Sequence, residues 1–461
     1  MEKKDIPKNN IYLMLFFIVG ALISCVTFRF SLYYGFLASI VFCASIFISY
    51  GFSKVELLNM MKKGVLASKP IVALLILIGA TIPIWISSGV VPTMMYFGLE
   101  YMQGINFLLG AFILTSIISV FMGTAFGTMS TIGIALLGLG KVFGIPNYIL
   151  LGAIVSGAFI ADKFSPISAL LNFTLLTTKS KYSDTIKVML VTLIPTYLIT
   201  CVIYFYIGSK FTKTSSSIDI DNLTLAIRNG FYISPLLLLI PLLIVILSFI
   251  GVKIIKALSV GLLCAVAASI LLQKLSFIQT IILIFTGYKG HTSSAQLNIM
   301  LISSGITSMV GVVLVIMGAL VLYNLFYGTG VINPVINNMV SKISTRADLI
   351  LKTGLISSSL TIITCDQTVG VILPGELLRG KYKELGFESS ILARTISDTG
   401  GIIAPIIPWN VNSIFILAIT NISAMQYAPY ALLCYISPIV TIAVILIFKV
   451  KDKNIGKSIN D

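Results

Sequence analysis

Charged residues are scarce in this sequence. They make up 10% of the 461 residues, whereas hydrophobic residues make up 57%, and the mean hydropathy is +1.04. A soluble globular domain carries about 25% charged residues, so this class of protein is excluded. Apolar stretches of about 18 to 22 residues recur along the chain, and each can cross a hydrocarbon core. The sequence therefore predicts an all-α polytopic membrane protein with roughly 11 transmembrane helices.

Residues that build common catalytic and metal sites are also few. His291 is the only histidine, which excludes a histidine-based metal site, and the six cysteines form no CxxC pair. The sequence contains no phosphate-binding loop, nucleophile elbow, metalloprotease motif or dinucleotide fingerprint. We therefore expect no enzyme and no cofactor. A channel stays open as an alternative, although the interrupted segments described below favour a transporter.

Basic residues outnumber acidic ones, with 31 Lys and Arg against 16 Asp and Glu. In a polytopic protein this excess is informative through its position, because cytoplasmic loops are enriched in Lys and Arg. Most basic residues fall on one side if the N-terminus is cytoplasmic, and the C-terminal tail then lies on that side too. The first apolar run is interpreted as a span and not as a cleaved signal peptide. We expect membrane lipid and a small-molecule or ion substrate as partners, and no nucleic acid. The oligomeric state is left open by the sequence, with a homodimer as the assembly considered.

Two parts of the chain resemble each other at a distance of about 240 residues, as in transporters built from repeats. Segment 72–94 is similar in character to 312–335, and segment 116–138 to 359–378. Asp162, in a Ser- and Pro-rich setting, is matched with Asp398. Because the loops after the first pair differ in basic content, we predict inverted-topology repeats containing broken helices. The predicted units are N-terminal helices 1–69, a first repeat 70–208, an external linker 209–232, connecting helices 233–298, a second repeat 299–448 and a cytoplasmic tail 449–461.

Three acidic residues, Asp162, Asp366 and Asp398, are flanked by apolar segments. A charge near the bilayer centre costs several kcal/mol unless it is paired, protonated or in a cavity. These residues either cap interrupted helices or line a cavity where the helices are broken, and their Gly- and Pro-rich surroundings favour the cavity.

Hydroxyl, amide and carboxylate groups near these acids are suitable ligands for a hard cation. A buried carboxylate can also exchange a proton for a cation near neutral pH. The predicted ion- or substrate-binding residues are Thr124, Thr128, Asp162, Ser165, Ser168, Asn172, Asp366, Gln367, Asp398, Thr399 and Asn410. Asp162 and Asp398 are the predicted sodium ligands.

Four motifs resemble the NhaC family of sodium/proton antiporters within the wider ion transporter superfamily. They are GTAFGTMSTIGIAL, GAIVSGAFIADKFSPIS, DQTVGVILPGELLRGKYKELG and ARTISDTGGIIAPIIPWN. The resemblance runs from about residue 70 to the end and implies a bacterial cytoplasmic-membrane antiporter, with sodium ions and protons as transported or coupling ions. Some members of the family move malate or lactate. The motif positions carried over are Asp162, Lys163, Ser165, Pro166, Ser168, Asp366, Gln367, Arg394, Asp398, Pro408, Trp409 and Asn410.

The sequence departs from the family pattern where an aspartate is expected and Ala169 stands instead. The element Gly-Thr-Ala-Phe at 123–126 also differs from the family. An organic acid or amino acid is therefore the alternative substrate, with Lys163 or Arg394 as the partner of its carboxylate. For Lys163 we expect an ion pair with Asp398 or Asp366, or else a side chain that extends to the membrane interface. Arg394 is either a charge partner or a cytoplasmic anchor.

Overall fold

The computed structural model describes residues 6–101, 105–212, 220–331, 343 and 345–457, and these residues contain helices and no strand. Seven helices are long and apolar enough to cross a membrane, or up to ten if each bent pair is one span. The prediction of an all-α polytopic membrane protein is confirmed. The uninterrupted spans are fewer than predicted because several apolar segments are broken internally. Parts of the predicted linker, second repeat and tail lie outside the described residues.

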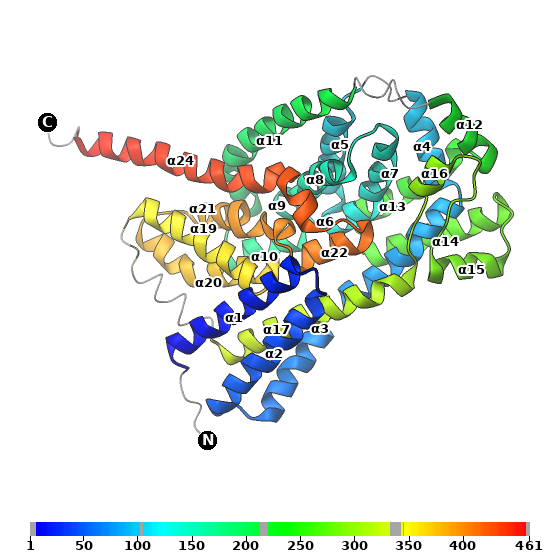
Figure 1. Ribbon diagram of the computed structural model, residues 1–461. Helices are drawn as coiled ribbons and strands as arrows, with labels where there is room; N and C mark the ends of the chain where they lie inside the picture. The colour runs from blue at the N-terminus through cyan, green and yellow to red at the C-terminus, as the bar shows by residue number, and fades with distance from the viewer. Residues whose placement is uncertain (1–5, 102–104, 213–219, 332–342, 344, 458–461) are drawn as a thin grey trace.

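The N-terminal helices lie together with a helix from much later in the chain (Figure 1). They are α1 (Lys8–Thr27), α2 (Leu32–Ser49) and α3 (Lys54–Ser87), and the later helix is α17 (Met309–Thr329). A Cβ atom on Gly64 of α3 would lie 2.6 Å from the Cα of Val321, and one on Gly79 3.2 Å from the Cα of Ile306. Glycine therefore allows close contact at both points, and α3 and α17 run antiparallel.

The helices after α3 form a first group. In this group the chain leaves the helical conformation at two breaks, one between α5 and α6 and the other between α9 and α10. They are α4 (Val90–Tyr101), α5 (Phe107–Met122), α6 (Ala125–Thr128), the π-helical turn η1 (Met129–Gly133), α7 (Ile134–Val142), α8 (Asn147–Ala158), α9 (Ile160–Phe164), α10 (Ala169–Thr178) and α11 (Tyr182–Thr212).

Connecting helices lie at the opposite end of the view from α1 and α2 (Figure 1). They are α12 (Ile220–Gly230), η3 (Pro235–Leu238), α13 (Leu239–Phe249), α14 (Ile254–Leu271), α15 (Phe277–Thr286), α16 (Ala295–Met300) and η4 (Ile306–Ser308).

A second group follows α17 and repeats the pattern of the first. It consists of α19 (Arg346–Ile363), α20 (Gln367–Glu384), α21 (Ser389–Ile396), the π-helical turn η5 (Ser397–Gly401), η6 (Ala404–Ile406), α22 (Val411–Thr420), α23 (Ala424–Tyr427), η7 (Ala428–Tyr430) and α24 (Leu432–Lys457).

The boundaries of the two groups coincide at a constant spacing of 242 residues. Helices α8 and α21 begin at Asn147 and Ser389, and α10 and α22 span Ala169–Thr178 and Val411–Thr420. The end of α5 and the end of α19 each meet a residue with positive φ, Gly123 at 66° and Cys365 at 60°. The same spacing relates Ser87 at the end of α3 to Thr329 at the end of α17. These matches support the predicted repeat, and the antiparallel packing of α3 on α17 is what inversion requires.

Each repeat holds its two breaks together with a hydrogen bond to an equivalent carbonyl. The Ser165 hydroxyl donates to the carbonyl oxygen of Val120 at 2.5 Å, and the Trp409 indole donates to that of Ile362 at 2.9 Å. Because a broken helix frees its terminal carbonyls, these bonds satisfy groups that would otherwise be costly in a membrane.

The spacing of 242 residues changes one expected correspondence. Asp398 is equivalent to Ser156, and Asp162 is equivalent to Ala404, so the match of Asp162 with Asp398 is displaced by six positions. Ser156 shares a hydrogen bond of 2.8 Å with Tyr204 of α11, and Asp398 also contacts α11. The two acids therefore occupy different places in their repeats, which permits them different roles.

Candidate functional site

A buried ion pair joins the two repeats. Lys163 lies in the short helix α9, and Asp398 lies in the π-helical turn η5 of the other repeat. The Lys163 ammonium pairs with Oδ1 of Asp398, and the two side chains are 2% and 0% exposed. The expected pairing of Lys163 with an acid across the repeat interface is thus observed, and the alternative of an extended side chain at the membrane interface is not.

Hydroxyl groups complete the surroundings of this pair. Oδ2 of Asp398 accepts hydrogen bonds from Thr192 at 2.7 Å and Thr441 at 2.8 Å. The Lys163 ammonium donates to Ser437 at 3.1 Å, and the Ser437 hydroxyl donates to the Asp398 carbonyl at 3.2 Å. A buried ion pair is tolerated only when such bonds compensate for lost hydration. Asp398 in this arrangement has little capacity left for another cation.

Asp162 has different surroundings although it is next to Lys163 in sequence. Adjacent residues of a helix point about 100° apart, so the two side chains face different neighbours. Asp162 is half-buried, and its carboxylate interacts with the backbone amide of Ala125 and the side chain of Gln367. Within the described residues it forms no ion pair. Asp162 and the helix-capping Asp366 are therefore the two acids of the site that have no cationic partner among the described residues.

Amide side chains connect the two breaks of the second repeat. The Gln367 amide donates to the Gly401 carbonyl at 2.5 Å and accepts from Asn412 at 3.1 Å. Asn412 also donates to Asn410 at 3.0 Å, and Thr361 donates to the Gly400 carbonyl at 3.0 Å. The network links the Asp162 side of the site to the unwound backbone of η5.

Asp366 serves chiefly as a helix cap. It is the N-cap of α20, and its Oδ1 accepts a hydrogen bond of 2.9 Å from the backbone amide of Thr368. Its side chain is half-buried. For this acid, the capping interpretation describes the observed geometry, because the carboxylate meets the positive end of α20.

Several other predicted ligands bond within their own helix. The hydroxyls of Thr128 and Thr399 donate to carbonyls one turn earlier, at 2.9 Å and 2.6 Å. Asn172 is exposed and donates to the Ser168 carbonyl at 2.8 Å. Ser168 itself caps α10, and Thr124 is half-buried at the start of α6 without a capping bond. Of this group, only Thr124 is left with a hydroxyl that no described bond occupies.

Arg394 is buried but not paired in the way expected. Its side chain is 5% exposed, and no bond from its Nε atom to another described residue is present. The guanidinium lies near Tyr382, whose hydroxyl donates to Thr353 at 3.0 Å. The burial argues against a cytoplasmic anchor.

Sequence reasoning missed Thr192, Ser437 and Thr441. Thr192 belongs to a series of buried threonines one turn apart in α11, with Thr196 and Thr200. That spacing on an otherwise apolar helix is a signal that was available. Among the described residues, no three His, Cys, Asp or Glu side chains are grouped to hold a metal ion. A cation at Asp162 would draw its other ligands from hydroxyl, amide and carbonyl oxygens.

Known proteins similar to the chain are antiporters. The model of the Na+/H+ antiporter family matches residues 157–449. The Na(+)/H(+) antiporter NhaC of Alkalihalophilus pseudofirmus is 32% identical over 81% of each chain. The malate-2H(+)/Na(+)-lactate antiporter of Bacillus subtilis is 29% identical over 85% of this chain and 84% of its own. The arginine/ornithine antiporter ArcD of Halobacterium salinarum is 26% identical over 85% of this chain and 82% of its own.

Proposed function

Because the chain belongs to the Na+/H+ antiporter family, as its NhaC-like motifs predicted, we propose that it exchanges sodium ions for protons across a membrane. The supporting observation is that one buried carboxylate, Asp398, has a fixed cationic partner, whereas the neighbouring carboxylate of Asp162 has none among the described residues. Membership in a family of transporters also argues against enzymatic activity.

Asp162 is the proposed exchange site. A single uncompensated carboxylate in a membrane is stabilised by either a proton or a sodium ion, and the two compete for the same oxygens. Competition at one group is enough for antiport, because the site is loaded with one ion on each side of the membrane. The Thr124 hydroxyl and the free carbonyls of the broken helices are suitable further ligands for sodium.

The pair of Lys163 and Asp398 is the proposed fixed element of the site. The ammonium pairs with the Asp398 carboxylate, and both groups are held by hydroxyl groups from α11 and α24. Since the pair lies between the repeats, a relative movement of the repeats would change its surroundings. Alternating access of this kind needs two arrangements of similar free energy.

The proposal assigns a multi-pass protein to the bacterial cytoplasmic membrane with both termini in the cytoplasm. Its support is the family resemblance and the basic loops predicted on one side. Sodium ions and protons are the proposed transported or coupling ions, without a resident cofactor.

A test uses Asp162→Asn in proteoliposomes. Internal pH is recorded after a sodium gradient is applied, with lithium and potassium for comparison. We expect sodium-driven proton movement in the wild type and its loss in the variant, because Asn cannot bind and release a proton. Glu100→Gln is the control, since Glu100 is an exposed acid in α4 that contributes to neither the site nor the basic pocket described below. Wild-type exchange by Asp162→Asn would contradict the proposal.

An organic substrate is the second candidate. Two observations favour it, the buried Arg394 without a described bond at Nε and the names of the malate/lactate and arginine/ornithine relatives. If sodium drives no proton movement in a folded wild-type sample, radiolabelled carboxylates and amino acids should be tested as counter-substrates.

A further inference from the structure

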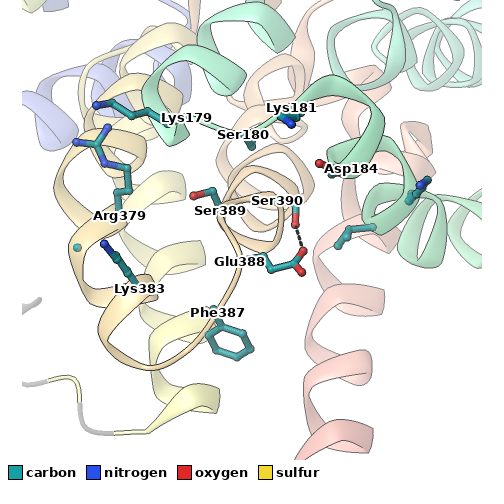
Figure 2. A pocket seen from close by; sticks show the side chains of 13 residues that line it. Lys179, Ser180, Lys181, Asp184, Arg379, Lys383, Phe387, Glu388, Ser389 and Ser390 are labelled. Carbon is teal, nitrogen blue, oxygen red and sulfur yellow. Dashed lines mark hydrogen bonds between the residues drawn. The ribbon is translucent and has the colours of Figure 1, made fainter.

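A basic pocket lies where the two repeats meet at one end of the molecule. Its volume is about 890 Å³. Six residues between Lys179 and Val188 line it from the first repeat, and seven residues between Arg379 and Ser390 line it from the second. Figure 2 shows Lys179, Arg379 and Lys383 on one side of this pocket and Asp184 and Glu388 on the other.

The pocket carries an excess of positive charge. Five basic residues line it against two acidic ones, and the basic residues are Lys179, Lys181, Lys187, Arg379 and Lys383. None of the five forms an ion pair within the described part of the chain, whereas Lys352 and Lys381 pair with Asp348 and Glu384 nearby in sequence. The carboxylate of Glu388 instead accepts a hydrogen bond of 3.0 Å from Ser390. The positive charge of the pocket thus has no ion-pair partner within the described residues.

The repeat supplies an internal comparison. A second pocket of about 130 Å³ is lined by Gly138, Asn147 and Asn421, which the spacing of 242 residues makes equivalent to Gly380, Ser389 and Lys179. Leu137 stands there in place of Arg379, and no charged residue lines this second pocket. The repeated fold therefore forms a pocket without cations, so the charge of the basic pocket is not a requirement of packing.

Polar groups without described partners lie one turn beyond the pocket wall. Arg394 follows Ser390 by four residues in α21, so the two lie on one face of that helix. The Thr185 amide donates a hydrogen bond of 3.0 Å to the carbonyl of Lys181, which lines the pocket. Arg394 is 5% and Thr185 0% exposed. The Arg394 Nε and the Thr185 hydroxyl have no described hydrogen-bond partner. Buried polar groups are normally hydrogen-bonded to protein or ordered water, so these two atoms are available to a partner outside the described residues.

We propose that the basic pocket binds a multivalent anion bearing phosphate or carboxylate groups. Arg379 offers a fork suited to such groups, the lysines add charge, and α21 begins at the pocket with backbone amides that favour anions. A bound dianion would leave less positive charge at this end, so sodium ions would approach it against less repulsion. The inference goes beyond sodium/proton exchange and does not depend on it.

The experiment measures binding at equilibrium, without an ion gradient. Wild-type protein is placed in nanodiscs of zwitterionic phosphatidylcholine and titrated with inorganic phosphate and with succinate at low ionic strength. A second set of nanodiscs contains phosphatidylglycerol, and thermal unfolding is compared between the two. The test variant is Arg379→Gln with Lys383→Gln. The control variant is Lys253→Gln with Lys256→Gln, two basic residues that do not line the pocket.

Saturable binding of phosphate or succinate in zwitterionic nanodiscs would support the proposal and identify a soluble anion. Stabilisation by phosphatidylglycerol alone would support it and identify a lipid headgroup. In either case we expect the affinity or stabilisation to fall at least about tenfold in the test variant and to persist in the control variant. No binding by the wild type to any of the three anions would overturn the proposal. Undiminished binding by a folded test variant would overturn it as well.

Discussion

Asp162 and Lys163 are neighbours in sequence, yet their side chains have different partners. Lys163 pairs with Asp398 of the other repeat, whereas Asp162 interacts with Ala125 and Gln367. An acid and a base adjacent in an apolar segment therefore do not neutralise each other. The two side chains point about 100° apart around the helix axis. Lys163 can therefore form the ion pair between the repeats while Asp162 stays free to bind a mobile ion.

Replacement of Asp398 by Asn tests the structural role of the pair. The variant leaves Lys163 buried without its anion, and we expect a loss of about 3 to 5 kcal/mol in the free energy of unfolding. Thermal or denaturant unfolding in detergent measures this loss. The double variant Lys163→Met with Asp398→Leu should recover much of the stability, because it removes both charges. An Asp398→Asn protein as stable as the wild type would show that the ion pair contributes little.

At the scale of helices, the breaks explain why the site could be predicted only in part. The acids, the Gly- and Pro-rich settings and the repeat were visible in the sequence, and so was a bond from Lys163 to an acid. The exact register of the repeat, a spacing of 242 residues, was not visible in the sequence. At that spacing Asp162 and Asp398 are not equivalent to each other but to Ala404 and Ser156, so the acids themselves give no guide to it. The apolar segment 104–122 has the length expected of a full span, although the helix there is Phe107–Met122 and ends at a break.

The threonine and serine ligands were missed for a related reason. A hydroxyl in a membrane helix commonly bonds to the preceding turn, so sequence alone cannot distinguish Thr192 from Thr196. The Thr196 hydroxyl donates to the Thr192 carbonyl, one turn earlier in the same helix, at 2.7 Å. The Thr192 hydroxyl reaches the other repeat and donates to the Asp398 carboxylate at 2.7 Å. The difference arises from the packing of α11 against the second repeat, which a single sequence does not contain.

Gly123→Ala tests the break after α5. Gly123 has φ of 66°, and a Cβ atom there would lie 2.3 Å from Cγ1 of Ile167 in the other break. We expect a loss of more than about 1 kcal/mol in unfolding free energy, since both the backbone and the contact are strained. Gly110→Ala in the same helix is the control, because no atom lies within 4 Å of its Cβ position. Equal unfolding temperatures for the two variants would argue against a strained break.

Over the whole molecule, the equivalent helices run antiparallel in two separate places. In addition to α3 and α17, α11 and α24 pack with Tyr204 near Leu432, while Thr192 and Thr441 both reach Asp398. Antiparallel contact of equivalent elements is the geometry of a pseudo-twofold axis. If that axis lies in the membrane plane, the basic pocket and its uncharged counterpart open on opposite sides of the membrane.

Thiol labelling tests that arrangement. Ser389→Cys and Asn147→Cys place single cysteines at equivalent positions of the two pockets, in a background without the six native cysteines. With a membrane-impermeant maleimide, we expect Ser389→Cys to be labelled in inside-out vesicles and Asn147→Cys in intact cells, because basic loops favour the cytoplasm. Lys253→Cys serves as a marker of the cytoplasmic side, because its loop, with Lys253 and Lys256, belongs to the basic loops predicted there. Labelling of both pocket cysteines from the same side of the membrane would exclude inverted repeats. Labelling from opposite sides would show that the two pockets open to different compartments. The positive charge of the basic pocket would then lie at the cytoplasmic entrance alone.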